Sequence, residues 1–207
     1  MIFFYHLFSV LVMLVVVPCF VLCSFFSRNK WRRLSDHFGL VSLSDKTEST
    51  PKTIWFHAIS LGEVVGVTPT IRLLKKSRPQ DRIVISVTTD SGFEAAKRKL
   101  PDVDSIFFFP LDCFVFTWTA LKKIKPDLFV LVETGFWPGF IHLLHLKRVP
   151  ILLFNGRISS RSMRKYKMFG SFFSKQFNRF TMLCIQNPHS KNKLESLGVE
   201  KSRLMVV

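Results

Sequence analysis

Cysteine is scarce in this 207-residue sequence, and its scarcity excludes several kinds of site. The 4 cysteines are scattered, and none belongs to a Cys-x-x-Cys pair. A disulfide framework and a zinc or redox motif built on paired cysteines are therefore excluded, and a reducing compartment fits. The patterns Gly-x-x-x-x-Gly-Lys and Gly-x-Gly-x-x-Gly are also missing. Their absence excludes the usual cradles for nucleoside triphosphates and dinucleotides.

Acidic residues are few as well. The 14 Asp and Glu face 30 Lys and Arg, which gives a formal net charge of +16 and a pI near 10.1. Such a chain is attracted to anions, whether nucleic acid, acidic lipid or a phosphorylated substrate, and charge alone does not choose among them. The length suits one domain of ordinary size with an additional segment.

Charged side chains are absent from residues 1–27, and Phe3 to Phe26 forms an almost unbroken apolar run. Roughly 20 such residues can cross a bilayer, so we predict a single-pass transmembrane anchor over 1–27. A cleaved signal peptide would have basic residues before the run, and a helix lying in the interface would have a polar face. Basic residues follow the run instead: Arg28, Lys30, Arg32 and Arg33. They predict that the rest of the chain faces the cytoplasm.

Beyond the anchor we expect a basic juxtamembrane segment and polar linker over 28–52. Short β-rich runs then alternate with helical patterns, and the predicted strands are Thr53–Ala58, Arg82–Thr88, Ser105–Phe109, Asp127–Val132, Pro150–Asn155 and Thr181–Gln186. Runs that are apolar throughout suit strands buried on both faces of a parallel sheet. We therefore predict an α/β fold with one Rossmann-like, doubly wound domain over 53–198. Residues 199–207 resemble a turn that enters another strand, and we interpret them as the start of a linker to a further domain.

The loop after the first predicted strand offers a candidate general base. Glu63 lies where the helix Val64–Lys76 begins, and the positive end of that helix would keep its carboxylate ionised. An ionised carboxylate at a cleft can accept a proton from a hydroxyl nucleophile. The competing interpretation is a capping box, Ser60 to Glu63, with a purely structural role. The same spacing recurs from Ser91 to Glu94, so the pattern alone does not decide.

Two later loops carry further polar groups. Glu133 comes before Phe136-Trp137-Pro138, which fits either a sugar-binding element or the start of a buried helix. Asn155 to Lys165 combines arginines and hydroxyls at a predicted helix start, which fits either a phosphate or carboxylate site or a solvated basic face. In the helix that follows, phenylalanines at 169, 172, 173, 177 and 180 share one side. This stripe indicates a core face or, less commonly, contact with anionic lipid.

Two weaker patterns are set aside. Asp102-Val-Asp104 matches the Asp-x-Asp motif of metal-dependent sugar transferases, but it precedes a strand and so lies at the wrong edge of the sheet. His142 and His145 have no nearby carboxylate and are expected to be packed or exposed.

Four motifs together resemble the ordered motifs of bacterial 3-deoxy-D-manno-octulosonic acid (Kdo) transferases. They are Trp55-Phe-His-Ala-Ile-Ser-Leu-Gly-Glu63, Thr88-Thr-Asp-Ser-Gly92, Val132-Glu-Thr-Gly-Phe-Trp-Pro138 and Asn155-Gly-Arg-Ile-Ser-Ser-Arg-Ser162. Four motifs in order are far more specific than one. The resemblance extends over the whole chain, and the stretch Arg32–Gly39 is similar to the family's basic segment after its membrane helix.

The resemblance implies the N-terminal, acceptor-binding half of a metal-independent GT-B glycosyltransferase without a cofactor. It implies transfer of Kdo from CMP-Kdo to a lipid A precursor in lipopolysaccharide synthesis, at the cytoplasmic side of the inner membrane, with Glu63 as general base. The implied substrate-binding residues are Ser60, Gly62, Thr88, Ser91, Gly92, Glu133, Asn155, Arg157, Ser159, Arg161 and Ser162. The family's CMP-binding domain is C-terminal, so we expect this chain alone to bind acceptor weakly without turnover.

One departure and one alternative accompany this reading. Members of the family often carry a second glutamate at the place of Gly135, so a role that rests on that side chain does not transfer. The alternative function is a non-catalytic, membrane-tethered α/β module for a nucleotide or nucleic acid. The basic residues are spread over several segments and form no nucleic-acid motif, so we expect an anionic membrane surface rather than nucleic acid as a partner.

Overall fold

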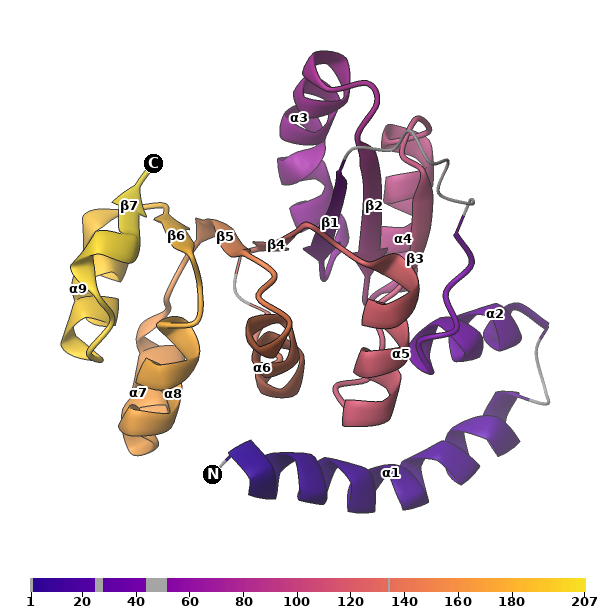
Figure 1. Ribbon diagram of the computed structural model, residues 1–207, viewed down its shortest axis with the longest axis horizontal. Coiled ribbons are helices and arrows are strands. Elements are labelled where there is room, and N and C mark those ends of the chain that lie inside the picture. Colours follow the sequence, from indigo (N-terminus) through magenta and orange to yellow (C-terminus); the bar gives the residue numbers. More distant parts are fainter. Residues whose placement is uncertain (1, 25–27, 44–51, 134) are drawn as a thin grey trace.

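The computed structural model describes residues 2–24, 28–43, 52–133 and 135–207, and these contain one parallel sheet of seven strands. The strand order is β3-β2-β1-β4-β5-β6-β7 (Figure 1). The strands are β1 (Thr53–Ala58), β2 (Arg82–Val87), β3 (Ser105–Phe108), β4 (Leu128–Val132), β5 (Ile151–Gly156), β6 (Met182–Ile185) and β7 (Leu204–Val206). The predicted doubly wound α/β domain is confirmed, and the six predicted strands differ from the observed ones only at their ends.

Helices precede and connect these strands. They are α1 (Ile2–Ser24), α2 (Arg28–His37), α3 (Leu61–Ser77), α4 (Asp90–Lys99), α5 (Phe114–Ile124), α6 (Pro138–Leu146), α7 (Ser160–Met168), α8 (Gly170–Phe177) and α9 (Pro188–Ser196). The start of α9 agrees with the sequence, because Asn187 accepts a hydrogen bond from the Ser190 N–H and proline takes the first turn. Gly198, with φ +88°, follows its end.

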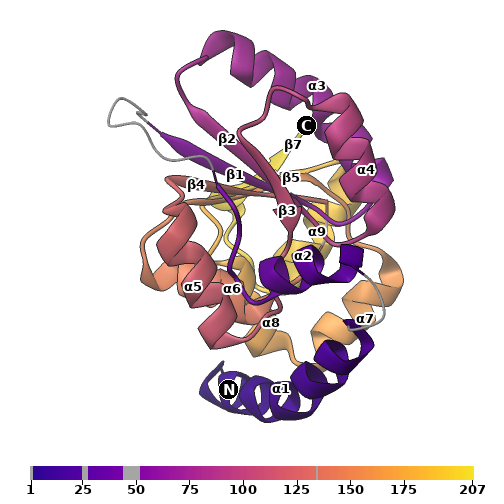
Figure 2. The ribbon, with the colours of Figure 1, turned by 90° about the vertical axis from the view of Figure 1, so that its right-hand side faces the viewer.

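The sheet has a hydrophobic cluster on each face. Alternate residues of β1 show the division: Ile54 and Phe56 pack with α3 and α4, whereas Trp55 packs with α5 and α6 on the other face. Figure 2 shows α3 and α4 on one side of the strands and α5, α6 and α8 on the other. Because both faces are covered, the central strands can be apolar throughout.

Residues outside the predicted domain limits also belong to the folded unit. Leu204–Val206 continues the sheet as β7, which pairs in parallel with β6. At the opposite edge, Asp36 accepts a hydrogen bond from the Phe108 N–H, and Val41 is fully buried. Residues 34–43 belong to the segment predicted as a basic juxtamembrane segment and linker over 28–52, and in the structure they pack against the edge of the sheet at β3. The rest of that segment from 44 to 51, and 25–27 of the predicted anchor, lie outside the described residues.

No helix in the described part of the chain is both long and apolar enough to cross a membrane, so the predicted transmembrane anchor is not supported.

Helix α1 packs along the outside of α5 and α6 (Figure 1). The hydroxyl of Tyr5 donates a 2.6 Å hydrogen bond to the carboxylate of Asp112, which is almost fully buried. The same carboxylate accepts hydrogen bonds from the N–H groups of Gly139 and Phe140, at 3.0 and 2.6 Å, where α6 begins. Asp112 therefore accepts hydrogen bonds from the first N–H groups of α6 and also holds α1 through the hydroxyl of Tyr5.

The phenylalanine stripe from 169 to 180 does not lie on one helix. The chain breaks at Phe169, between α7 and α8, and Phe169 is 55% exposed. Phe177 and Phe180 are buried in the core, and Phe173 packs against it. The core interpretation is therefore confirmed for the later part of the stripe, and the first residue lies on the surface.

Candidate functional site

The predicted site residues follow the carboxyl ends of four strands, β2, β1, β4 and β5, which are consecutive neighbours in the sheet. Glu63 follows β1, Thr88 follows β2, Glu133 follows β4, and Asn155 lies at the end of β5. All these strands are parallel, so the sheet brings the four loops to one edge, where open α/β sheets bind ligands.

Glu63 lies in the first turn of α3, and its carboxylate accepts a 2.6 Å hydrogen bond from the N–H of Ile59. Ser60 occupies the N-cap position, but its side chain makes no capping hydrogen bond. The reciprocal capping box is therefore not formed. Oε2 of Glu63 accepts from the N–H of Ile59, and the other carboxylate oxygen, Oε1, takes no part in that hydrogen bond.

The protonation of Glu63 is shifted. Burial raises the pKa of this carboxyl group from its ordinary value of 4.5 to about 7, the hydrogen bond from Ile59 opposes the shift, and the charge of Glu133 adds to it. The sequence position predicted an ionised carboxylate, whereas burial, the largest influence on this group, favours the protonated form. Near neutral pH both forms are populated, which suits a group that takes up and releases a proton.

Ile59 joins the loops after β1 and β2. Its carbonyl oxygen accepts hydrogen bonds from the N–H groups of Thr88 and Thr89 and from the Thr89 hydroxyl, at 3.1 to 3.2 Å. Thr88 Oγ1 is buried without a hydrogen-bond partner among the described residues. The backbone of Ile59 thus links the loop after β2 to Glu63.

The start of α4 differs from the predicted Ser91 capping pattern. Thr89 is the N-cap, and its hydroxyl accepts a hydrogen bond from the N–H of Gly92. Ser91 is exposed, with its hydroxyl 3.2 Å from that of Thr89. Gly92 is buried, and a Cβ there would lie 3.1 Å from Thr89 Oγ1 and 3.4 Å from the backbone carbon of Ser60. The absence of a side chain at Gly92 therefore leaves room for the capping hydroxyl of Thr89.

Glu133 and Asn155 end neighbouring strands in the left-handed backbone region, with φ of +58° and +59°. Non-glycine residues adopt this conformation at a cost, and such residues cluster at functional sites. The N–H of Glu133 donates to the carbonyl of Phe154, and the carbonyl of Asn155 accepts from the Gln186 side chain. These contacts hold both residues at the edge where Glu63 lies.

The Asn155–Ser162 motif opens α7. Ser159 is its N-cap and accepts a hydrogen bond from the Ser162 N–H, while Ile158 between the exposed Arg157 and Ser159 is buried. Arg157 and Arg161 are both exposed. The loop is thus anchored by one apolar side chain and presents two arginines to solvent, so an anionic ligand can reach them.

One residue at this edge was not among the predicted site residues. Arg33 of α2 forms two hydrogen bonds to the carboxylate of Asp90, at 2.9 and 2.8 Å, and a third at 3.4 Å to the carbonyl of Thr88. The only sequence signal was its place in the basic segment after the apolar run. The partners are more than fifty residues away along the chain, so the sequence alone could not pair them.

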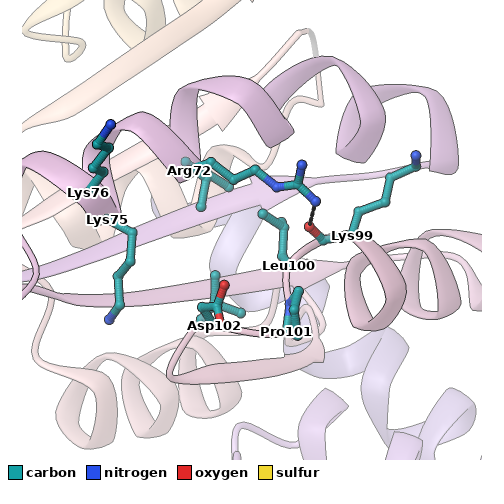
Figure 3. A pocket seen from close by; sticks show the side chains of 9 residues that line it. Arg72, Lys75, Lys76, Lys99, Leu100, Pro101 and Asp102 are labelled. Carbon is teal, nitrogen blue, oxygen red and sulfur yellow. Dashed lines mark hydrogen bonds between the residues drawn. The ribbon is translucent and has the colours of Figure 1, made fainter.

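A basic pocket of about 360 Å³ lies at the opposite, amino-terminal edge of the sheet. Figure 3 shows Arg72, Lys75, Lys76 and Lys99 around it, with Arg72 donating to the carbonyl of Lys99. Asp104, near this pocket, accepts from the N–H of Ile83 and pairs with Lys75, so it acts structurally. The pocket is remote from Glu63 and is not part of the candidate site.

A metal site is also not evident. The described residues contain no group of three or more His, Cys, Asp or Glu side chains that could hold a metal ion. Burial lowers the pKa of His142 to about 4 and keeps the ring neutral. Independence from metals stays a prediction.

A family model and several curated relatives are similar to this chain. The model of the family described as 3-deoxy-D-manno-octulosonic-acid transferase (kdotransferase) matches residues 32–207. A 3-deoxy-D-manno-octulosonic acid transferase of Haemophilus influenzae is 27% identical over 98% of this chain and 47% of its own length. A bifunctional glycosyltransferase/methyltransferase of Fusobacterium nucleatum is 35% identical over 84% of this chain and 26% of its own. The chain thus spans about half the length of the Haemophilus transferase.

Solved structures support the fold. The S. aureus MnaA–UDP structure superposes with a TM-score of 0.56 at 12% identity, over 75% of this chain and 44% of that one. MurG of Acinetobacter baumannii gives 0.50 at 12% identity, over 68% and 42%. These similarities concern the fold alone. The match of the family model over most of the chain shows that the chain belongs to the 3-deoxy-D-manno-octulosonic acid transferase family.

Proposed function

We propose that this chain is the acceptor-binding half of a glycosyltransferase that transfers Kdo from CMP-Kdo to a lipid A precursor, with Glu63 as the general base. The observation that carries the proposal is the position of Glu63. Its carboxyl group lies at the carboxyl edge of the sheet, is held by Ile59, and has a pKa raised to about 7. A base with a pKa near the working pH combines a populated ionised form with a useful affinity for the proton.

The chemical step needs no group beyond the two substrates and this carboxylate. A hydroxyl oxygen of the acceptor sugar forms a bond to the anomeric carbon of Kdo, and its proton passes to Glu63. The bond between that carbon and the phosphate of CMP breaks, and CMP leaves with the electron pair. The chemistry does not require a metal ion, and the family's C-terminal half would bind the donor.

The remaining loops supply binding groups in this proposal. Ser60, Gly62, Thr88, Ser91 and Gly92 line the acceptor side near Glu63. Glu133 and Asn155 face the same edge, and Arg157, Ser159, Arg161 and Ser162 meet phosphate or carboxylate groups. Arginine suits this task because its planar fork matches the oxygens of both anions.

The acceptor is a membrane lipid, and α1 offers a face for a membrane. The exposed apolar residues of α1 recur at helical spacing and include Phe4, Phe8, Leu11 and Val15, with Phe4 70% exposed. An apolar groove of about 310 Å³ lies beside them, lined by Phe4, Tyr5, Phe169, Phe172 and Phe173. The other side of α1 packs on α5 and α6, and we propose that this exposed apolar face rests against the cytoplasmic side of the anionic inner membrane, where the basic charge of the chain adds attraction.

The test is Kdo transfer from CMP-Kdo to a lipid A precursor by the whole enzyme that contains this chain. Glu63→Gln keeps an oxygen to accept from Ile59 but cannot take up the proton. We expect a loss of kcat of about 10²- to 10⁴-fold, the range typical of a general base. Glu94→Gln is the matched control, because Glu94 has the same spacing from a serine but is exposed on α4. Equal activity of the Glu63→Gln variant and the wild type would overturn the proposal.

A further inference from the structure

Arg33 is held in place by groups that do not depend on its ion pair. Its Nε–H donates to His37 Nε2 at 3.4 Å, its guanidinium lies 4.9 Å from the centre of the Phe108 ring, and its Nη2 reaches the Thr88 carbonyl. His37 Nδ1 lies 2.7 Å from the carbonyl oxygen of Phe109, which can only accept, so Nδ1 carries the proton and Nε2 is left to accept from Arg33. The guanidinium is therefore oriented from three sides.

The partner of Arg33 is held much more loosely. The side chain of Asp90 is 76% exposed, against 31% for Arg33. An exposed ion pair of this kind contributes little to stability, so its carboxylate can leave at little cost. If Asp90 turned away, the His37, Phe108 and Thr88 contacts would still hold the fork of Arg33.

Arg33 is also connected to the catalytic candidate. It bonds to the carbonyl of Thr88, the N–H of Thr88 bonds to the carbonyl of Ile59, and the N–H of Ile59 bonds to Glu63. The segment that carries it follows α1, whose exposed face we assign to the membrane. Hydrogen bonds through Thr88 and Ile59 therefore link Arg33 to the loop of Glu63.

We propose that Arg33 binds a phosphate group of the lipid acceptor, and that Asp90 occupies this place until the phosphate displaces it. The proposal rests on the function proposed above and names a residue for acceptor recognition. Both oxygens of Asp90 contact a single nitrogen of Arg33, Nη1, and the oxygens of a phosphate group at that place would accept the same charge-assisted hydrogen bonds. Asp90 is then a competing internal anion, which lowers affinity for weaker anions and for unphosphorylated lipid.

The test is a binding measurement, so it does not depend on transfer. The 207-residue chain in detergent is titrated with a lipid A precursor and with the same lipid after phosphatase treatment. Arg33→Gln should weaken binding of the phosphorylated lipid about tenfold or more, as expected for the loss of a charge-assisted contact. Asp90→Asn should tighten it several-fold. In the Arg33→Gln background the Asp90→Asn change should have no effect, and the dephosphorylated lipid should respond to neither.

Controls separate this role from a structural one and from other anions. Arg72→Gln removes an arginine that also bonds to a backbone carbonyl but lies at the opposite edge, and it should leave affinity unchanged. Phosphatidylglycerol vesicles and CMP are the other sources of phosphate, and Arg33→Gln should affect neither. Three results would each overturn the proposal. Asp90→Asn could bind the phosphorylated lipid more weakly, Arg33→Gln could lose equal affinity for both lipids, or the loss in Arg33→Gln could be confined to vesicles or CMP. We expect Glu63→Gln to lose transfer but to keep phosphate-dependent binding. The transfer test of Glu63 and the binding test of Arg33 can therefore fail independently of each other.

Discussion

The backbone N–H of Ile59 donates a 2.6 Å hydrogen bond to the carboxylate of Glu63, four residues further along the chain. The carbonyl of Ile59 accepts from Thr88 and Thr89. One residue thus fixes the candidate base and ties its loop to the next strand. Glu63 is therefore a positioned group rather than a free surface carboxylate, although burial, not the hydrogen bond, dominates its pKa.

The raised pKa of Glu63 predicts a pH-dependent stability difference. The folded state holds this proton more tightly than the unfolded chain, so the wild type loses stability as pH rises from about 4.5 to above 7. Glu63→Gln cannot ionise. We expect urea unfolding to show that this variant gains stability relative to the wild type between pH 5 and pH 8. The control Glu94→Gln should show no such trend, and a constant difference for Glu63→Gln would contradict the shift.

The contact between Tyr5 and Asp112 predicts how α1 is retained. Tyr5→Phe removes one hydrogen bond to a buried carboxyl group and should cost about 1–3 kcal/mol, with faster hydrogen exchange in α1 and little change in the sheet. Asp112→Ala should cost more, because the N–H groups of Gly139 and Phe140 also lose their acceptor.

Tyr166→Phe serves as the control for this comparison, since Tyr166 lies on α7 and packs against Phe136 and Phe177. It should leave exchange in α1 unchanged. Unchanged exchange in Tyr5→Phe as well would show that the hydroxyl does not hold α1.

Gly135 and Ile59 predict a coupled pair. A Cβ at position 135 would lie 2.6 Å from Cδ1 of Ile59, so Gly135→Ala forces that side chain to move. We expect a cost of about 1 kcal/mol for Gly135→Ala. In the Ile59→Val background, which lacks Cδ1, the cost should largely disappear. A double-mutant cycle of unfolding free energies measures this, and additive effects would exclude the coupling.

Several parts of the fold were predictable because they are local. The run Leu128–Val132 is apolar throughout, and the structure buries it between two layers of helices. Asn187 and Pro188 predicted the start of α9, because capping depends on adjacent residues. The four site loops converge because parallel strands end at one edge, so their grouping also followed from the strand pattern.

The features that the sequence did not predict depend on distant contacts. The break at Phe169 lies within a regular aromatic stripe, and only packing separates its exposed first residue from the buried Phe177. The pairing of Arg33 with Asp90 joins segments that only the tertiary fold brings together. The pKa of Glu63 reflects burial by neighbouring loops, whereas its sequence position showed only that it begins a helix.

The pH dependence of kcat/KM for Kdo transfer by the whole enzyme tests the role of Glu63 as the general base most directly. If Glu63 is the base, the rate should rise with pH through an apparent pKa near 7 and level off above it, because only the ionised carboxylate accepts the proton. A rise centred near the ordinary glutamate value of about 4.5, or the same profile in the residual activity of Glu63→Gln, would contradict the assignment.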